Sequence, residues 1–568
     1  MKNDVFEACL EGRALEFFGS HFANSEDRRL AVQHAAARPL SPDVADALLA
    51  QNARYAPSEA RDRNLESLRS GAVAVVTGQQ VGLFLGPLFN VYKAASAVSA
   101  ARVLTAETGR PVVPVFWLQS EDHDLLEIAH FTSPGPVGGA PLTLRLPSPD
   151  DQRQSIAHLK LPTEVEQRLA ELRETVANTP QAAAHLDRLA RHYRSGARWV
   201  EAFAAALAEI FADEGLILID PRDDETSAAF SSVARRVHRR ALVGASPISQ
   251  VLRARGEQLQ VAGFQPAVHV RDGSPLGFFH PDGAEGPRYR LEPRDGGFAE
   301  VGGSRVHDLD TLLHALDEDP RRFSTSVLLR PILQDSLLPT AAYVGGPGEI
   351  AYFAQLAPLY AAYGMTMPLV VPRARLRVVD PPTRRRLTRH GLGTDDVMGS
   401  EDEVLAAAGR STSHAGPPAN AGPTDLRTAL FGPFETTLAG MRGELEHTGH
   451  GVGTAVVKTL ATVERAVAKL AEKVANARLQ QDRALVEDVR ALRASLAPNG
   501  LEQERVYGLS AFVARVGERG FLDRVLATIS PFDGARRDVF LDPGIDGEGA
   551  TKDEAIGDES CAAGDGPE

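Results

Sequence analysis

Cysteine is almost absent from the chain. Of the 568 residues only Cys9 and Cys561 are cysteines, so the sequence offers neither a disulfide framework nor a cysteine-based metal site. The first residues also lack the apolar core and the cleavage pattern of a signal peptide. We therefore expect a cytoplasmic protein.

An excess of basic residues is missing too. The chain has 61 Lys and Arg against 75 Asp and Glu, a net charge of -14, which disfavours a nucleic-acid partner. Half of this net negative charge lies in residues 544–568, which contain eight acidic residues, one lysine and few large apolar side chains. We expect these residues to form a disordered acidic tail outside the folded domains.

Familiar cofactor motifs and membrane spans are also lacking. The sequence has no glycine-lysine pair for a P-loop and no GxGxxG after a predicted strand. Residues 70–92 and 350–372 are charge-free runs of 23 residues each, long enough to cross a bilayer. Both contain proline and glutamine, which are costly in lipid, so we predict no membrane partner.

One stretch near the N-terminus organises the rest of the chain. Residues 72–76 are an apolar, β-branched run, as in a strand buried on both faces. Gly78, Gly82 and Gly86 follow at intervals of four, and Pro87 then opens a helical pattern. A strand, a glycine loop and a helix in this order predict an open α/β sheet whose ligand lies above the strand ends.

Further strands and two insertions follow. Residues 112–117 predict a strand, although Pro114 disfavours full pairing of it, and residues 216–220 predict another. A helix-rich insertion is expected at about 135–213. A β-rich insertion with Asp-Gly turns is expected at about 250–325. We predict a parallel-sheet core over residues 1–380 that carries both insertions.

The last third of the chain is predicted to be helical. We assign residues 381–500 to a helical coiled-coil domain and residues 501–543 to a segment that packs back on the core. An antiparallel helical hairpin and a dimer contact both fit the pattern. Its apolar seam alternates steps of four and three and comprises Val456, Leu460, Val463, Val467, Leu470 and Val474, with a second run at Leu485, Val489, Leu492 and Leu496.

Four polar residues at the end of the second strand are candidates for catalysis. Glu121, Asp122, His123 and Asp124 follow the strand at 112–117, where open α/β folds place ligands. Carboxylates around an imidazole can hold a proton-transfer group near neutral pH. The alternative is an acidic first turn of a helix. His123 would also share a helix face with Glu127 and His130, a possible metal set, although HEXXH is missing.

Other polar residues lie at two glycine-rich junctions and are candidates for binding. At the first junction Gln79 and Gln80 can hydrogen-bond polar groups of a substrate or the backbone of the loop itself. Lys93 can contact an anion or extend into solvent. Glu349, at the second, can cap a helix or meet a cation. Arg330 can pair with Asp335 or hold a carboxylate bidentately. The remaining candidates nearby are Gln334, Tyr343, Gly345, Gly346 and Gly348.

Four blocks together resemble the BshC family of bacillithiol biosynthesis. They read TGQQVGLFLGPLFNVYKAASA, PVFWLQSEDHDLLEI, LLRPILQDSLLPTAAYVGGPGEIAYFAQL and QERVY, in the family's order between about residues 70 and 530. The resemblance implies a Rossmann-like core and a coiled-coil domain used for homodimerisation. It also implies a ligase that adds cysteine to the amine of glucosaminyl malate. Phe89, Asn90 and Gly508 depart from the expected residues.

The resemblance leaves the chemistry of activation open. Joining a carboxylate to an amine needs activation, and a nucleotide (ATP or ADP) at residues 78–87 is one hypothesis, with another acyl donor as its rival. We expect Gln79, Gln80 and the helix N-terminus to bind an anionic group, and His123 or Asp122 to take a proton from the amine. No metal is expected. A metal-dependent hydrolase and a noncatalytic coiled-coil scaffold remain as alternatives.

Overall fold

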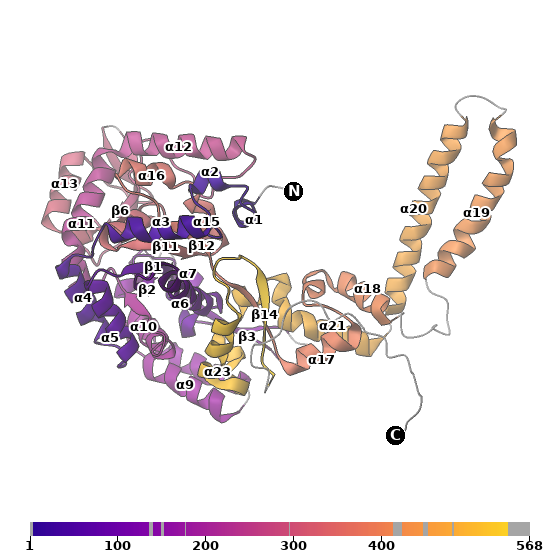
Figure 1. Ribbon diagram of the computed structural model, residues 1–568, viewed down its shortest axis with the longest axis horizontal. Helices are drawn as coiled ribbons and strands as arrows, with labels where there is room; N and C mark the ends of the chain where they lie inside the picture. The colour runs from indigo at the N-terminus through magenta and orange to yellow at the C-terminus, as the bar shows by residue number, and fades with distance from the viewer. Residues whose placement is uncertain are drawn as a thin grey trace, which may run out of the picture.

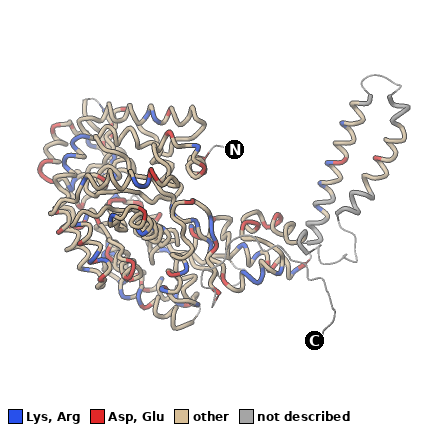
Figure 2. The backbone as a smooth tube through the Cα atoms, viewed as in Figure 1, with Lys and Arg blue, Asp and Glu red and all other residues tan. Residues whose placement is uncertain are grey.

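The computed structural model describes residues 4–135, 140–148, 153–176, 178–294, 296–412, 423–446, 452–479 and 482–542. In Figure 1 a large body contains most of the strands, and a pair of long helices projects from a smaller helical unit at one end. Basic and acidic residues are interspersed over the body in Figure 2. The predicted acidic tail, 544–568, lies outside the described residues.

A parallel sheet of five strands forms the centre of the body. Its strand order is β12-β11-β1-β2-β5. The strands are β1 (Val73–Gln79), β2 (Val112–Leu118), β5 (Ile217–Ile219), β11 (Thr340–Gly345) and β12 (Leu369–Pro372). The predicted α/β class and all three early strands are confirmed. β2 pairs with β1 along its whole length, Pro114 included, and its shorter pairing with β5 reflects the three-residue length of β5, so Pro114 does not prevent pairing.

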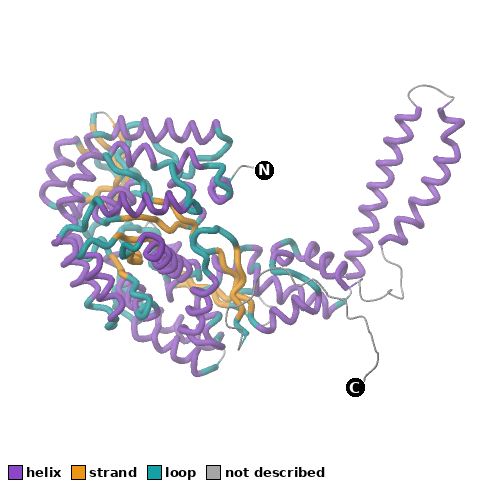
Figure 3. Tube along the Cα trace, viewed as in Figure 1, coloured by secondary structure: helices purple, strands orange, loops and turns teal. Residues whose placement is uncertain are grey.

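Helices enclose this sheet, which is why its strands are apolar on both faces (Figure 3). Helix α6 (Phe89–Thr108) packs against β1 and β2 and ends at Gly109, whose φ is 68°, as the sequence predicts. The N-terminal helices are α1 (Val5–Leu10), α2 (Leu15–Phe18), α3 (Ser25–Ala36), α4 (Pro42–Asn52) and α5 (Glu59–Arg69).

The first insertion is mainly helical and begins with a small hairpin that the sequence analysis missed. After α7 (Leu125–Ile128), strands β3 (His130–Ser133) and β4 (Leu142–Arg145) pair antiparallel. The helices that follow are α8 (Glu164–Thr175), α9 (Pro180–His192) and α10 (Trp199–Ile210).

The second insertion is a five-stranded sheet with the order β10-β6-β7-β8-β9. Its elements are β6 (Gly277–Phe279), β7 (Tyr289–Arg294), β8 (Gly297–Glu300), β9 (Val306–His307), α13 (Leu309–Glu318) and β10 (Phe323–Thr325). The predicted start at 250 is wrong. Helix α11 (Asp224–Val243) and helix α12 (Ala245–Val261) cover that position, because residues 245–261 are rich in Ala, Leu, Gln and Arg, which favour helix.

The chain returns to the central sheet and then crosses to the helical unit. The elements of the return are α14 (Leu329–Leu337), α15 (Pro347–Phe353) and α16 (Ala357–Ala362). Strand β13 (Arg375–Val379) pairs in parallel with β14 (Arg536–Phe540). After α22 (Gln503–Val506), helix α23 (Val513–Thr528) packs on α9 and α6. The end of the described chain therefore lies against the core.

The helical unit divides the predicted seam between two places. Helices α17 (Pro381–His390), α18 (Glu401–Thr412) and α21 (Arg483–Leu496) share a core that buries Leu485, Val489, Leu492 and Leu496. Helices α19 (Pro423–Glu446) and α20 (Val452–Leu479) form the projecting antiparallel hairpin, hereafter the arm (Figure 1). The hairpin is confirmed for the first run, but placing the second run in it is wrong.

No described helix has both the length and the apolar composition needed to cross a membrane. The charge-free run at 70–92 forms β1 and the start of α6. The run at 350–372 is divided among α15, α16 and β12. Most residues of both runs are buried within the body of the protein, which accounts for their lack of charge.

Candidate functional site

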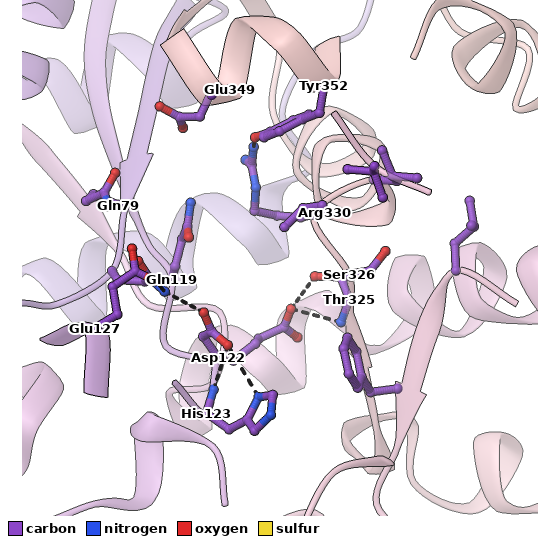
Figure 4. Close-up of a pocket in the computed structure, with 18 of the residues that line it drawn as sticks. Gln79, Gln119, Asp122, His123, Glu127, Thr325, Ser326, Arg330, Glu349 and Tyr352 are labelled. Carbon is purple, nitrogen blue, oxygen red and sulfur yellow. Dashed lines mark hydrogen bonds and ion pairs between the residues drawn. The ribbon is translucent and has the colours of Figure 1, made fainter. Parts of the chain in front are cut away.

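A cavity of about 610 Å³ opens where three strands of the central sheet end. The loops after β1, β2 and β11 provide three parts of its lining, and the β-rich insertion provides another (Figure 4). The sequence-predicted residues that line it are Gln79, Gln80, Lys93, Glu121, Asp122, His123, Arg330, Gly346, Gly348 and Glu349. Residues separated by more than 200 positions thus meet at one edge of the sheet.

One wall of the cavity carries carboxylates around an imidazole. The His123 backbone N–H donates to Asp122 Oδ1 over 2.7 Å, and His123 Nδ1 lies 3.4 Å from the same oxygen. Gln80 Nε2 donates to Asp122 Oδ2 over 2.6 Å. Burial raises the pKa of Asp122, but hydrogen bonds from His123 and the charge of Arg288 outweigh it and bring the pKa well below the usual range. The low pKa keeps Asp122 in the ionised form, within ion-pair distance of the His123 ring.

The other two carboxylates of the predicted cluster have different roles. Glu121 Oε2 accepts from the Thr325 backbone N–H over 3.1 Å, and the Thr325 hydroxyl also donates to it. Glu121 thus joins the strand-end loop to the β-rich insertion. Asp124 is exposed and caps α7 through the Glu127 N–H. Its placement in the site is wrong, because the helix-start alternative applies to this residue.

The opposite wall carries Arg330, which is only 5% exposed. Its guanidinium donates to Gln334 Oε1 over 2.6 Å, to the Tyr343 hydroxyl over 3.1 Å and to the Tyr352 hydroxyl over 2.7 Å. All three partners are neutral. The predicted pairing with Asp335 is absent, because Asp335 accepts instead from Gln334 and Tyr360. Gln334, Asp335 and Tyr343 support Arg330 from behind and do not line the cavity.

Lys93 and Glu349 form a buried ion pair that also lines the cavity. Lys93 Nζ donates to Gly78 O over 2.8 Å and to Gln79 Oε1 over 2.6 Å, so its three hydrogens are all engaged. Glu349 also accepts from the Gly346 N–H over 2.8 Å, which caps α15. Burial lowers the pKa of Lys93, and Glu349 partly offsets this shift. Lys93 thus binds neighbouring protein groups rather than a free anion.

The glycine loop does not form a phosphate cradle. Leu83, Phe84 and Leu85 within it are fully buried. A Cβ at Gly86 would lie 2.6 Å from Asn90 Nδ2, and one at Gly82 would lie 2.8 Å from Gly86 Cα. These glycines permit close packing within the loop and lie outside the cavity lining. The predicted ligand role of Gly82 and Gly86 is therefore wrong.

The backbone amides at this junction are engaged as well. Leu85 N–H donates to the Tyr193 hydroxyl, and Leu88 N–H, at the start of α6, donates to Tyr507 O. Residues 82–88 therefore do not fit a nucleotide phosphate, and they do not support the nucleotide hypothesis at this place. Gly78 and Gly345 also lie outside the cavity lining. Gly78 supplies the carbonyl that Lys93 binds, and Gly345 O accepts from the Arg373 N–H.

Comparison with known proteins identifies the family. A model of the N-terminal Rossmann-like domain of BshC, a protein of bacillithiol biosynthesis, matches residues 10–374, and a model of its C-terminal coiled-coil domain matches residues 432–539. The chain belongs to the BshC family. This result confirms the resemblance and the Rossmann-like assignment of the core.

Curated relatives agree over most of the chain. The Salinibacter ruber protein is 32% identical over 509 residues, which cover 88% of this chain and 90% of the relative. The Koribacter versatilis relative is 33% identical, and the match covers 84% of this chain and 85% of the relative. The Geobacillus kaustophilus relative is 30% identical, and the match covers 88% of this chain and 90% of the relative. All three are named "Putative cysteine ligase BshC". The solved arginyl-tRNA synthetase of Thermus thermophilus, at a TM-score of 0.16 and 12% identity, supports no inference.

Several cavity residues of this BshC family member were missed by the sequence analysis. Arg288 is 4% exposed, stacks 3.6 Å from the centre of the Phe278 ring and donates to Glu121 O. Burial lowers the pKa of Arg288 to about 10. Arg373 lines another part and pairs with Glu504. No motif marks these residues. For Arg288 the available signal was the high arginine content of the β-rich insertion.

Glu127 was considered only as a metal ligand, but it is part of the cavity lining. Its Oε2 accepts from Gln80 Nε2 over 2.7 Å. Loss of solvation raises the pKa of Glu127, and the Gln80 hydrogen bond partly offsets this effect. His130 lies outside the cavity lining, on β3, and no group of three His, Cys, Asp or Glu within the described residues is arranged to hold a metal ion. The geometry does not support the hydrolase alternative.

Proposed function

We propose that this chain joins cysteine to the amine of glucosaminyl malate through an amide bond, as a ligase of bacillithiol biosynthesis. The cavity carries the proposal, because it places a carboxylate-imidazole wall opposite a buried arginine without a carboxylate partner among the described residues. An amine and a carboxylate are the groups that such walls recognise. The names of the relatives support the same reaction.

Within this cavity we assign the proton transfer to His123. An amine that is protonated near neutral pH must lose a proton before it can attack a carboxyl carbon. Asp122 is a poor acceptor because its neighbours keep its pKa low, and it lies beside His123 Nδ1, where it stabilises the protonated ring. His123 is about one-third exposed and lines the cavity, so substrate can reach it.

We assign the recognition of a substrate carboxylate to Arg330. The buried guanidinium hydrogen-bonds only neutral groups, and the nearest carboxylate that acts on it, Glu349, is already paired with Lys93, so a substrate carboxylate can bind it directly. Arg373 is a weaker candidate, because Glu504 already accepts from it over 2.5 Å. Arg330→Gln should raise the KM of the carboxylate-bearing substrate by about tenfold or more, while Arg384→Gln, at an exposed position outside the cavity lining, should not.

The direct test is product formation. The purified protein would be incubated with glucosaminyl malate, cysteine and, in separate reactions, ATP, ADP or no nucleotide, and the mixture would be analysed by mass spectrometry. We expect a product with the mass of both substrates minus one water. Absence of this product under every condition would contradict the proposed reaction. The nucleotide series also reports which activation the protein uses.

We further propose that the protein works in the cytoplasm as a homodimer assembled through the arm. Large apolar side chains of the arm are exposed on the isolated chain: Val457 is 61% exposed, Leu470 48%, Leu430 47% and Met441 45%. An apolar surface of this kind on a projecting hairpin favours association with a second copy.

A further inference from the structure

One amide side chain holds two carboxylates at the mouth of the cavity. Gln80 Nε2 donates to Asp122 Oδ2 over 2.6 Å and to Glu127 Oε2 over 2.7 Å. Ionised carboxylates only accept hydrogen bonds, so the NH₂ end of the amide must face them. Both hydrogens of Nε2 are then used, and the orientation of the amide is fixed.

The carbonyl end of Gln80 is left without a donor. Gln80 is 8% exposed and lines the cavity, and no donor within the described part of the chain is bonded to its Oε1. Oε1 is not among the buried side-chain atoms of the described residues that lack a partner, so it keeps contact with the solvent in the cavity. It is therefore accessible to a donor on a molecule that enters the cavity.

The charge balance at this wall is also incomplete. Asp122 accepts from the His123 backbone N–H, and the positive charge of Arg288 offsets its own. Glu127 is an exposed residue at the cavity that forms no ion pair with any described residue, and its bonded side-chain partner is the neutral Gln80 amide. Lys93 cannot compensate it, because its three hydrogens go to Gly78, Gln79 and Glu349.

The missing group is therefore a cation with several N–H donors. A primary ammonium group carries one positive charge and three donors, which match Gln80 Oε1, the Glu127 carboxylate and the remaining lone pairs of Asp122. In Figure 4 Glu127 and His123 lie on different sides of Asp122. An ammonium bound between Glu127 and Asp122 would thus lie on the other side of Asp122 from His123.

We propose that Gln80 and Glu127, together with Asp122, form the subsite that binds the primary ammonium group of a substrate. The proposal rests on the proposed function for its two candidate ligands, because cysteine and glucosaminyl malate both carry a primary amine. Glu127 holds this amine in its protonated form. Desolvation is the main cause of the raised pKa of Glu127, and a bound cation would lower that pKa.

The test compares the binding of each amine with that of its N-acetyl form. Calorimetry would measure Kd for glucosaminyl malate, L-cysteine and their N-acetyl forms, in which a neutral amide replaces the ammonium. The wild type should bind one free amine at least about tenfold more tightly than its N-acetyl form, the effect of a charge-assisted hydrogen bond. Glu127→Gln should abolish that preference. Glu201→Gln, a control at a 63% exposed position on α10, should retain it.

If Glu127→Gln no longer binds one of the two free amines more tightly than its N-acetyl form, that amine is the ammonium bound at the subsite. Equal preferences in the wild type and Glu127→Gln for both pairs would overturn the subsite, as would a wild type that prefers neither free amine. A turnover assay on the same proteins separates the two proposals. Product formation with an unchanged preference in Glu127→Gln rejects the subsite and leaves the function. A lost preference without any product rejects the function and leaves the subsite.

Discussion

The central sheet and the arm bury their apolar residues in different ways. In β1, β2 and β11 the apolar side chains are at most 7% exposed, because helices enclose the sheet. In the arm Val457 and Leu470 are 61% and 48% exposed. The sheet is thus stabilised within one chain, whereas the arm keeps apolar surface that a second molecule can cover.

A similar spacing of apolar residues also has two outcomes within the helical unit. In α21 Leu485, Val489, Leu492 and Leu496 are buried against α17 and α18. In α20 the comparable positions Val456, Leu460, Val463 and Val467 are half-buried beside α19. An apolar seam with alternating steps of four and three residues identifies the helix face that packs, but not the partner that covers it.

The largest expected effect is on the stability of the sheet region. Phe116 in β2 is fully buried and packs 6.1 Å from Phe203, centre to centre. Phe116→Ala should lower the free energy of unfolding by about 3 to 5 kcal/mol, measured by denaturant titration. Leu470→Ala in the arm should cost less than about 1 kcal/mol, because much of that side chain is already in water. Equal losses in the two variants would contradict this contrast.

The next effect concerns the buried ion pair at the strand ends. Burial alone would raise the pKa of Glu349, but Lys93, the Gly346 N–H and the Tyr343 hydroxyl outweigh it and lower that pKa in the folded state. Glu349→Gln leaves Lys93 buried without its partner and should cost about 3 kcal/mol at neutral pH.

The sign of its pH dependence follows from the lowered pKa. A carboxylate whose pKa is lower when folded contributes stability above its unfolded value, about 4.3 for glutamate, and loses this contribution as the pH falls. The difference between the wild type and Glu349→Gln should therefore be largest near pH 6 to 7 and shrink below about pH 4. Denaturant titrations at several pH values measure it. A difference that grows on acidification would reject the assignment.

A catalytic variant tests whether the cavity does chemistry at all. His123→Ala should lower turnover by roughly 10² or more, the usual scale for losing a general base. The melting temperature should hardly change, because His123 is one-third exposed and its ring makes few contacts. Near-normal turnover would reject the role of His123. Similar tolerance of alanine at Asp122 and Arg330 would favour the noncatalytic scaffold.

Association through the arm should respond to charge in its seam. Leu460→Asp combined with Leu470→Asp should shift the protein towards monomer in sedimentation velocity, since a charge in an apolar contact is costly. The body should keep its melting temperature. A wild-type monomer, or an unchanged dimer in the double variant, would contradict the proposed assembly.

The smallest expected effect belongs to the acidic tail. Removal of residues 544–568 should leave the melting temperature and turnover nearly unchanged, because this segment has few apolar side chains to offset its ordering entropy. Thermal unfolding and the product assay on the truncated protein check this expectation. A marked loss in either would show that the tail contributes contacts of its own.

The sequence by itself determined the order of strands and helices around the cavity. Uncharged β-branched runs specify strands that are covered on both faces, and Gly109 ends α6 because its positive φ suits glycine. The clusters at 79–80, 121–123 and 346–349 were found because each follows a strand, and parallel strands end at one edge. The BshC blocks strengthened these predictions with a family and its reaction.

Tertiary structure alone decided which of the candidates share the cavity. Arg288 reaches the carbonyl of Glu121 across 167 positions, and Thr325 reaches its carboxylate across 204. No local pattern encodes contacts of such separation, because they depend on where the β-rich insertion folds back. Gly82 and Gly86 resembled ligand-binding glycines, yet their close packing on each other and of Gly86 on Asn90 accounts for them. Composition and spacing fix local backbone preferences, whereas the placement of side chains in a cavity depends on how distant elements pack.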